Sequence, residues 1–117
     1  MGLTEVTVVI HGQLGRTPSR LLVDTGSTYT WIDGDLLKQI GVTPIATERF
    51  RTMDKRTVER PVADIILEYE GSRRYCPVAF AEKDDANVLG ATAMEIIGLE
   101  VDPSTREVKR ITAHTAY

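Results

Sequence analysis

An aspartate that follows directly on an apolar run places the strongest constraint on this chain. The apolar residues 21–23 predict a buried strand, which runs straight into Asp24 and the small residues 25–28. Aspartate is unfavourable in strands, and burying its charge costs free energy unless hydrogen bonds or a shared proton offset that cost. Two interpretations follow: an Asx-turn that ends a strand, or a carboxylate held in place for chemistry.

Most of the remaining chain predicts short strands separated by turns. Strands are expected over the stretches 4–11, 20–23, 29–32, 48–52, 57–70, 73–81, 87–90, 100–101 and 107–111, with loops at 12–18 and 102–105. Two short helices are expected, one between Asp33 and Gly41 and the other over Ala91–Ile97. Trp31 is expected to anchor the core. Strand and helix do not alternate regularly, so the pattern predicts a compact all-β domain.

Length and composition exclude several classes of protein. At 117 residues the chain can bury a core of its own, and we expect one domain over residues 1–117. A net charge of −3 argues against a nucleic-acid partner. No apolar run has the length of a membrane span, and residues 1–5 show no secretory signal. The one cysteine, Cys76, is expected as a small buried hydrophobe in a reducing compartment, so a cytoplasmic location is expected.

A second motif relates the Asp24 turn to a known family. The segment Val88-Leu89-Gly90 precedes the expected helix 91–97, much later in the chain than the Asp-Thr-Gly-Ser sequence at 24–27. Two apolar residues followed by Asp-Thr-Gly-Ser, and later two apolar residues followed by Gly, resemble the two-part signature of retropepsins. These are the single-lobed, retroviral-type aspartic proteases. The resemblance extends over residues 3–112, although only the two motifs are specific.

This resemblance implies both a fold and a reaction. The fold would be a small closed barrel of the retropepsin type with one or two short helices. The reaction would be hydrolysis of a peptide bond in a protein or peptide substrate by an aspartic endopeptidase, without metal or other cofactor. Two carboxylates in contact cannot both ionise, so the pKa of one rises while the pKa of the other falls. The ionised carboxylate then takes a proton from water while the protonated one hydrogen-bonds the scissile carbonyl.

The chain supplies a single aspartate of the required kind. We therefore expect the second catalytic carboxylate to be Asp24 of another copy, brought close by a twofold axis in a homodimer. The other aspartates are expected at the solvated surface: Asp33, Asp35, Asp54, Asp64, Asp84, Asp85 and Asp102. By resemblance, Thr25 would form a hydrogen bond across the dimer axis and Gly26 would contact the substrate backbone. Ser27 would donate a hydrogen bond to the outer oxygen of Asp24.

Two places depart from the family pattern. Met53, Asp54, Lys55 and Arg56 predict a hairpin tip, which by resemblance would be the flap that covers the substrate. This tip lacks the usual glycines, and a plain connector is the alternative. The family's Asp–Arg pair is absent, with residues near Tyr29 and Ala91 in the corresponding places, so the dimer must be supported in another way.

Other charged residues show no pattern of a site. Arg49, Arg51, Lys55, Arg56 and Arg60 form a basic stretch that is expected to be a solvated face. His11 and His114 are isolated, and no cluster has the spacing of metal ligands.

Besides an active endopeptidase, two interpretations remain open. The first is a catalytically silent member of the same fold that serves as a dimerisation or peptide-binding module. The second is an unrelated small β-barrel in which Asp24 ends a strand in an ordinary Asx-turn.

Overall fold

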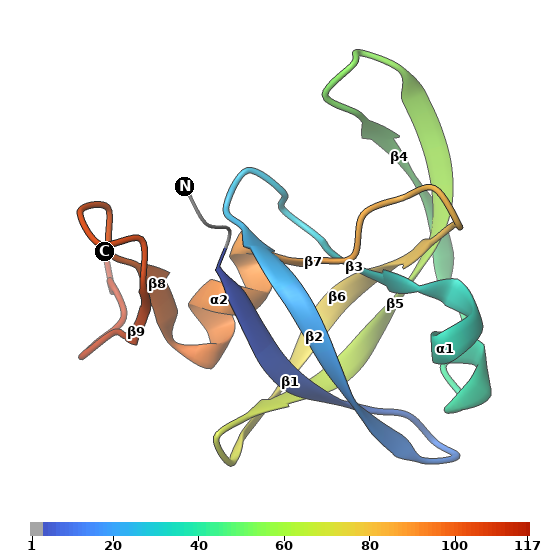
Figure 1. Cartoon of the computed structure of the whole chain (residues 1–117). Helices are drawn as coiled ribbons and strands as arrows, with labels where there is room; N and C mark the ends of the chain where they lie inside the picture. The colour runs from blue at the N-terminus through green and yellow to red at the C-terminus, as the bar shows by residue number, and fades with distance from the viewer. Residues whose placement is uncertain (1–3) are drawn as a thin grey trace.

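The computed structural model describes residues 4–117, and strands predominate in it (Figure 1). The strands are β1 (Glu5–His11), β2 (Arg16–Asp24), β3 (Thr30–Asp33), β4 (Ala46–Arg51), β5 (Thr57–Tyr69), β6 (Ser72–Ala81), β7 (Val88–Gly90), β8 (Leu99–Val101) and β9 (Val108–Arg110). The helices are α1 (Gly34–Gln39) and α2 (Ala91–Ile97). The predicted all-β class with two short helices is confirmed. Within residues 4–117, no helix is both long enough and apolar enough to cross a bilayer.

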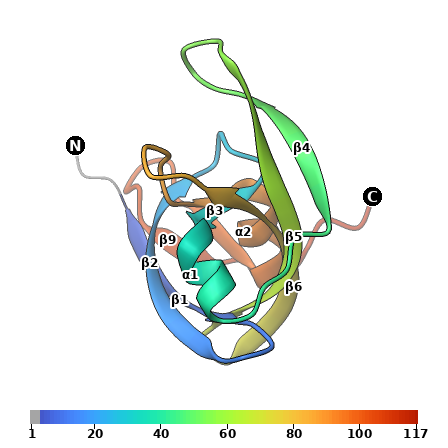
Figure 2. The same cartoon turned by 90° about the vertical axis from the view of Figure 1, so that its right-hand side faces the viewer.

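The main sheet closes on itself into a barrel. Its strand order is β1-β2-β7-β3-β6-β5-β4, and β1 also pairs with β5 through Val9–Glu68, Ile10–Leu67 and His11–Ile66. This second pairing closes a ring of β1, β2, β7, β3, β6 and β5 and leaves β4 outside, bonded to β5 alone. The hairpin of β4 and β5 therefore projects beyond the barrel, as both views show (Figures 1 and 2). The closed barrel predicted from the sequence is confirmed.

Strand alternation fills the barrel with aliphatic side chains. Val8 and Ile10 of β1 and Leu67 of β5 are wholly buried. Burial of each of these side chains contributes about 1.5–3 kcal/mol to stability. Cys76 on β6 is also buried, as predicted, and burial raises the pKa of its thiol to about 11. The thiol therefore stays protonated at neutral pH.

The two helices cover the barrel. Helix α1 lies at the barrel end that faces the viewer in Figure 2 and buries Leu37. It begins as predicted, because the carboxylate of Asp33 accepts a hydrogen bond from the amide of Asp35 at 3.0 Å. It ends at Gln39 with Ile40 as its C-cap, and Gly41, whose φ of +86° suits glycine, comes next. Helix α2 buries Ala93, Met94 and Ile97.

The predicted loop over residues 12–18 is too long. Strand β2 begins at Arg16, and the turn closes where the amide of Gly12 donates to the carbonyl of Gly15 at 2.8 Å. Pairing with β1 extends β2 even through Pro18, which lies opposite Val9. Pro61 lies in the part of β5 that pairs with β4 alone, and the ladder to β6 starts one residue later. One side of β5 is therefore an edge at this residue, which is a position that tolerates proline.

Parallel pairing of β2 and β7 brings the two sequence motifs side by side, with Asp24 opposite Gly90. The turn after Asp24 is then fastened to the start of α2. The amide of Ala91 donates to the carbonyl of Ser27 at 2.7 Å, and the amide of Gly90 donates to the buried hydroxyl oxygen of Thr30 at 3.0 Å. A Cβ at residue 90 would lie 2.3 Å from the carbonyl oxygen of Tyr29. This close approach therefore requires glycine.

The hairpin of β8 and β9 follows α2, and its turn is stabilised by Asp102. One oxygen of this carboxylate accepts hydrogen bonds from the amide and hydroxyl of Ser104, at 2.9 and 2.7 Å, and from the amide of Thr105 at 3.3 Å. These bonds favour the ionised form, with the Ser104 hydroxyl first, and they lower the pKa of Asp102 to about 2. The predicted turn at 102–105 is confirmed.

Gly90→Ala is expected to lower the free energy of unfolding by at least about 1–3 kcal/mol, because the methyl group would overlap fixed carbonyl oxygens. Denaturant unfolding followed by the fluorescence of Trp31 measures this change. Gly15→Ala is the control, since no heavy atom lies within 4 Å of a Cβ built there. Its effect should stay within about 0.5 kcal/mol. Equal unfolding midpoints for the two variants would contradict the close approach.

Acid is expected to loosen the turn at Asp102 only at very low pH. Because folding lowers this pKa, the stabilisation is complete above the ordinary value of 3.8 and is lost as the pH falls through about 2. In Ser104→Ala the main hydrogen bond is gone, so the pKa should rise toward 3.8 and the loss should begin at higher pH. Titration of the Asp102 carboxyl carbon by NMR tests this, and an unchanged titration in the variant would refute it.

Candidate active site

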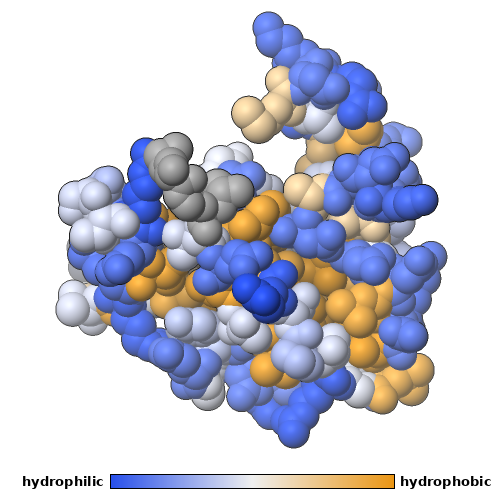
Figure 3. Space-filling model, in the orientation of Figure 1, coloured by the Kyte–Doolittle hydropathy of each residue, from blue (hydrophilic) through white to orange (hydrophobic). Residues whose placement is uncertain are grey.

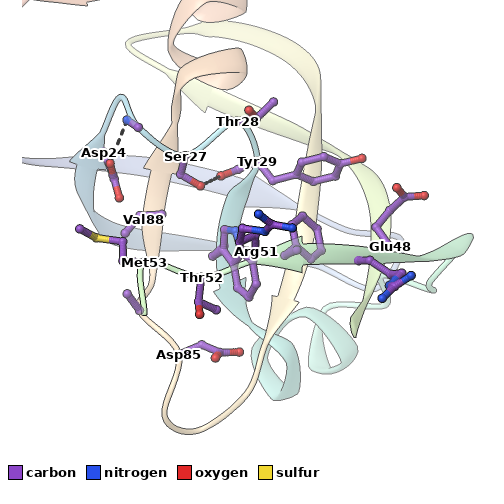
Figure 4. Close-up of a pocket in the computed structure, with 15 residues that line it drawn as sticks. Asp24, Ser27, Thr28, Tyr29, Glu48, Arg51, Thr52, Met53, Asp85 and Val88 are labelled. Atoms are coloured by element: carbon purple, nitrogen blue, oxygen red, sulfur yellow. Dashed lines mark hydrogen bonds between the residues drawn. The ribbon is translucent and has the colours of Figure 1, made fainter. Parts of the chain in front are cut away.

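A cleft of about 600 Å³ opens between the turn after Asp24 and the projecting hairpin of β4 and β5. The space-filling view shows this hollow between the hydrophilic hairpin and the body of the protein (Figure 3). Its walls come from the turn, from β3 and β4, from the hairpin tip and from the loop before β7. Figure 4 shows the side chains that line it.

Asp24 lies at the end of β2 on the wall of this cleft, with its side chain exposed. The amide of Gly26 donates to Oδ1 of Asp24 at 2.9 Å, the bond of an Asx-turn. Within residues 4–117, no other hydrogen bond to the side chain of Asp24 is present. One oxygen is therefore oriented by the backbone while the other remains accessible. The two interpretations of Asp24, an Asx-turn that ends a strand and a carboxylate held in place, therefore describe the same arrangement.

The hydroxyl of Ser27 has a different partner from the one predicted. It donates to the carbonyl oxygen of Tyr29 at 2.7 Å, so the expected bond to Asp24 is wrong. The physical reason is local: a serine hydroxyl has one proton, and the carbonyl two residues further along lies within its reach. Ser27 thus holds the shape of the turn, and Figure 4 shows this bond beside Asp24.

Thr25 and Gly26 lie on the same turn but line different surfaces. Gly26 lines the cleft with Asp24, and a Cβ there would lie 3.2 Å from Oδ1 of Asp24. Thr25 is exposed and lines a second groove of about 530 Å³, which is formed with α2, β8 and the C-terminal segment.

The predicted hairpin tip over residues 53–56 is confirmed. The amide of Thr52 donates to the carbonyl of Arg56 at 2.9 Å, and the amide of Lys55 donates back to Thr52 at 3.0 Å. Lys55 has a φ of +65°, a left-handed conformation of the kind that glycine adopts most easily. The tip therefore forms without glycine, with Lys55 in the strained position.

Of the four residues predicted to form a flap, one faces the cleft. Met53 is fully exposed and lines the cleft together with Asp24. Asp54 is held within the tip by the hydroxyl of Thr52 and by Nε of Arg56, which donates at 2.8 Å. The Thr52 bond is the main cause of the lowered pKa of Asp54. Asp54, Lys55 and Arg56 do not line the cleft.

Three aromatic residues form a wall that the sequence analysis did not identify. Phe50 on β4 makes edge-on contacts with Tyr29 at 5.1 Å and with Trp31 at 4.8 Å between ring centroids. Trp31 was predicted to lie in the core, but it is only half buried and lines the cleft. The physical reason is strand alternation, because Thr30 and Ile32 face the core and Tyr29 and Trp31 face the other side.

Arg60 and Asp85 were predicted to be solvated, and this prediction is wrong. Their side chains are 12% and 19% exposed and form an ion pair at 2.7 Å. The hydrogen bond from Arg60 lowers the pKa of Asp85, which is the other aspartate that lines the cleft. Its carboxylate is committed to a cation, so it does not serve as a proton-sharing partner for Asp24. Within residues 4–117, no group of three or more His, Cys, Asp or Glu side chains is arranged to hold a metal ion.

Comparison with known proteins agrees with this geometry. Residues 6–101, most of the chain, match a family model described as "Aspartyl protease". Among curated proteins, no relative matches the chain. The matched span includes the Asp24 turn, the hairpin, the aromatic wall and the Gly90 motif, and it excludes the interpretation of an unrelated small barrel. The chain therefore belongs to the aspartyl protease family, in its retropepsin-like type.

Proposed function

We propose that the protein is an aspartic endopeptidase that acts as a homodimer, with Asp24 of each copy forming the catalytic pair. The observation that carries this proposal is the Asp24 carboxylate itself. It lies on the family's Asp-Thr-Gly turn, at a cleft wall, with one oxygen held by the amide of Gly26. Membership of the family supports hydrolysis of peptide bonds. The catalytic domain would comprise the whole of residues 1–117.

The reaction requires two carboxylates in opposite states of protonation. The ionised Asp24 takes a proton from a water molecule, whose oxygen attacks the scissile carbonyl carbon, while the protonated Asp24 hydrogen-bonds the carbonyl oxygen. Collapse of the tetrahedral intermediate breaks the C–N bond, and a carboxyl proton passes to the leaving amine. Within residues 4–117, two other carboxylates line the cleft: Asp85 is paired with Arg60, and Glu48 lies on the opposite side of the cleft from Asp24 (Figure 4). A second copy supplies the missing group.

The surface around Thr25 suits contact with that second copy. A twofold axis between two Asp24 carboxylates passes close to Thr25, because the two residues are adjacent. The groove that Thr25 lines is apolar in part, with contributions from Met94, Leu99 and Ile111. The backbone bonds from the start of α2 to the Asp24 turn support the turn from within the chain.

The projecting hairpin would close over a peptide in the cleft. Met53 at its tip faces the same cleft as Asp24, as Figure 4 shows. The aromatic wall of Tyr29, Trp31 and Phe50 offers apolar surface to a substrate side chain. A catalytically silent peptide-binding module is the alternative, and the missing flap glycines favour it. A diverse peptide library, incubated with and without a transition-state-mimicking inhibitor of aspartic proteases, distinguishes the two.

Asp24→Asn is expected to abolish peptidase activity, since loss of acid–base catalysis costs on the order of 10²–10⁴-fold in rate. The variant should still dimerise, because asparagine keeps the shape of the side chain. Mixed in large excess with the native protein and allowed to exchange, it should inhibit by forming dimers with one Asp24. Initial rates on a cleavable library peptide measure both effects.

The control is Asp64→Asn, which removes an exposed carboxylate from β5 and should not inhibit in the same mixture. Native activity per chain should also fall on dilution below the dissociation constant of the dimer. If activity per chain is independent of concentration and excess Asp24→Asn has no effect, the paired mechanism is wrong.

Ser27→Ala is expected to lower stability and to leave the acid limb of the rate profile in place. The lost bond to the Tyr29 carbonyl is worth about 0.5–1.5 kcal/mol, whereas Asp24 receives no proton from this hydroxyl. Denaturant unfolding and a pH–rate profile measure the two effects. Thr28→Ala, a neighbouring exposed hydroxyl, serves as the stability control. An acid limb displaced to higher pH in Ser27→Ala would instead show that the hydroxyl of Ser27 bonds Asp24 in the working enzyme.

A further inference from the structure

The ion pair between Arg60 and Asp85 joins two walls of the cleft. Arg60 lies on β5 opposite Glu48, in the part of the hairpin that projects from the barrel. Asp85 lies in the loop 82–87, which leads from β6 into β7. Nε of Arg60 donates to Oδ2 of Asp85 at 2.7 Å, and Nη2 donates to Oδ1 at 3.0 Å. Figure 4 shows Asp85 on its loop at the edge of the cleft.

The same carboxylate also organises its own loop. Oδ2 of Asp85 accepts the amide of Glu82 at 2.8 Å, and the amide of Asp85 donates to the carbonyl of Glu82 at 2.9 Å. On the other side, Nη1 of Arg60 donates to the carbonyl of Glu59 at 2.8 Å, which fixes the guanidinium. In the part of the chain that the structure describes, the side-chain hydrogen bonds between loop 82–87 and the hairpin of β4 and β5 all involve Arg60.

This geometry gives the pair two effects on the cleft. A bidentate, largely buried Arg–carboxylate pair is stronger and more directional than an exposed one, so it fixes the distance between the two walls. It also neutralises Asp85, which otherwise would present a negative charge to whatever lies beside Ala86 and Val88. Small displacements of a binding wall change the orientation of a bound substrate and hence its affinity.

We propose that Arg60 and Asp85 are positioning residues for the substrate: their ion pair fixes the wall formed by loop 82–87 against the hairpin and neutralises the carboxylate that this loop presents to the cleft, so that uncharged rather than basic substrate side chains are accepted there. This inference rests on the proposed peptidase function and specifies its substrate preference. Neither residue touches the reacting atoms. Their effect is therefore expected in KM and in selectivity.

The test compares Arg60→Gln, Asp85→Asn and the double variant on peptide pairs that carry leucine or lysine at each position around a cleaved bond. Both single variants should raise KM for the leucine peptides about five- to tenfold with kcat nearly unchanged. The KM of the double variant should be no higher than that of either single variant, because the two residues act as one unit. Only Arg60→Gln leaves an unpaired carboxylate. It alone should raise the lysine-to-leucine ratio of kcat/KM, by about tenfold.

Arg73→Gln is the matched control, since it breaks another Arg–carboxylate pair, with Glu68, at the opposite end of β5. It should change neither KM nor selectivity. Equal effects in Arg73→Gln, or equal lysine-to-leucine ratios in Arg60→Gln and Asp85→Asn, would overturn the proposal. If Arg60→Gln does not fold, Arg60→Lys carries the test, and its retained charge should preserve selectivity while KM rises.

Hydrogen exchange separates this inference from the proposed function. The amides of residues 82–87 should exchange about tenfold faster in Arg60→Gln and Asp85→Asn than in the native protein, whether or not peptides are cleaved. An inactive native protein would refute the peptidase function and, with it, the substrate preference, while faster exchange would still establish that the pair fixes the wall. Unchanged exchange in 82–87 would refute the positioning role itself.

Discussion

The architecture of the site depends on one close approach, the parallel pairing of β2 with β7 at Asp24 and Gly90. Because residue 90 has no Cβ, the carbonyl of Tyr29 lies where a side chain would otherwise be. The amides at the start of α2 can then bond the turn that carries Asp24. The carboxylate is thus positioned by backbone groups, whose geometry varies less than that of long side chains.

The walls of the cleft are held differently, through side chains of the projecting hairpin. Phe50 packs against Tyr29 and Trp31 on one side, and Arg60 pairs with Asp85 on the other. Phe50 lies opposite Val58, one pair before the end of the ladder, and Arg60 lies opposite Glu48, further from the tip. Beyond them, the tip at 52–56 is held mainly by its own turn. The tip therefore extends past the residues that attach the hairpin to the body of the protein.

Local patterns predicted the strands, both helices, the cap at Asp33 and the tip at 53–56, because each depends on neighbours in sequence. The cleft walls escaped prediction because they depend on distant partners. Arg60 and Asp85 are 25 residues apart in hydrophilic segments, and their side chains leave water only where the hairpin meets loop 82–87. Alternation places Tyr29 and Trp31 on one face, but the sequence does not say which face of a barrel strand adjoins a cleft. The hydroxyl of Ser27 was predicted to bond Asp24, but it has a single proton, which it donates to the nearby carbonyl of Tyr29.

The proposed mechanism, in which each chain supplies one aspartate, has a consequence for the control of activity. Asp24 is exposed, oriented on one oxygen and without a carboxylate partner within residues 4–117, while the other cleft aspartate is neutralised by Arg60. One carboxylate cannot accept a proton from water and donate one to the scissile carbonyl at the same moment, so the proposed mechanism needs a second group. In the proposed homodimer, Asp24 of the second copy supplies that group, so the catalytic pair forms only on dimerisation. Catalytic competence would then rise with the square of monomer concentration at low concentration, so assembly and activation are one step.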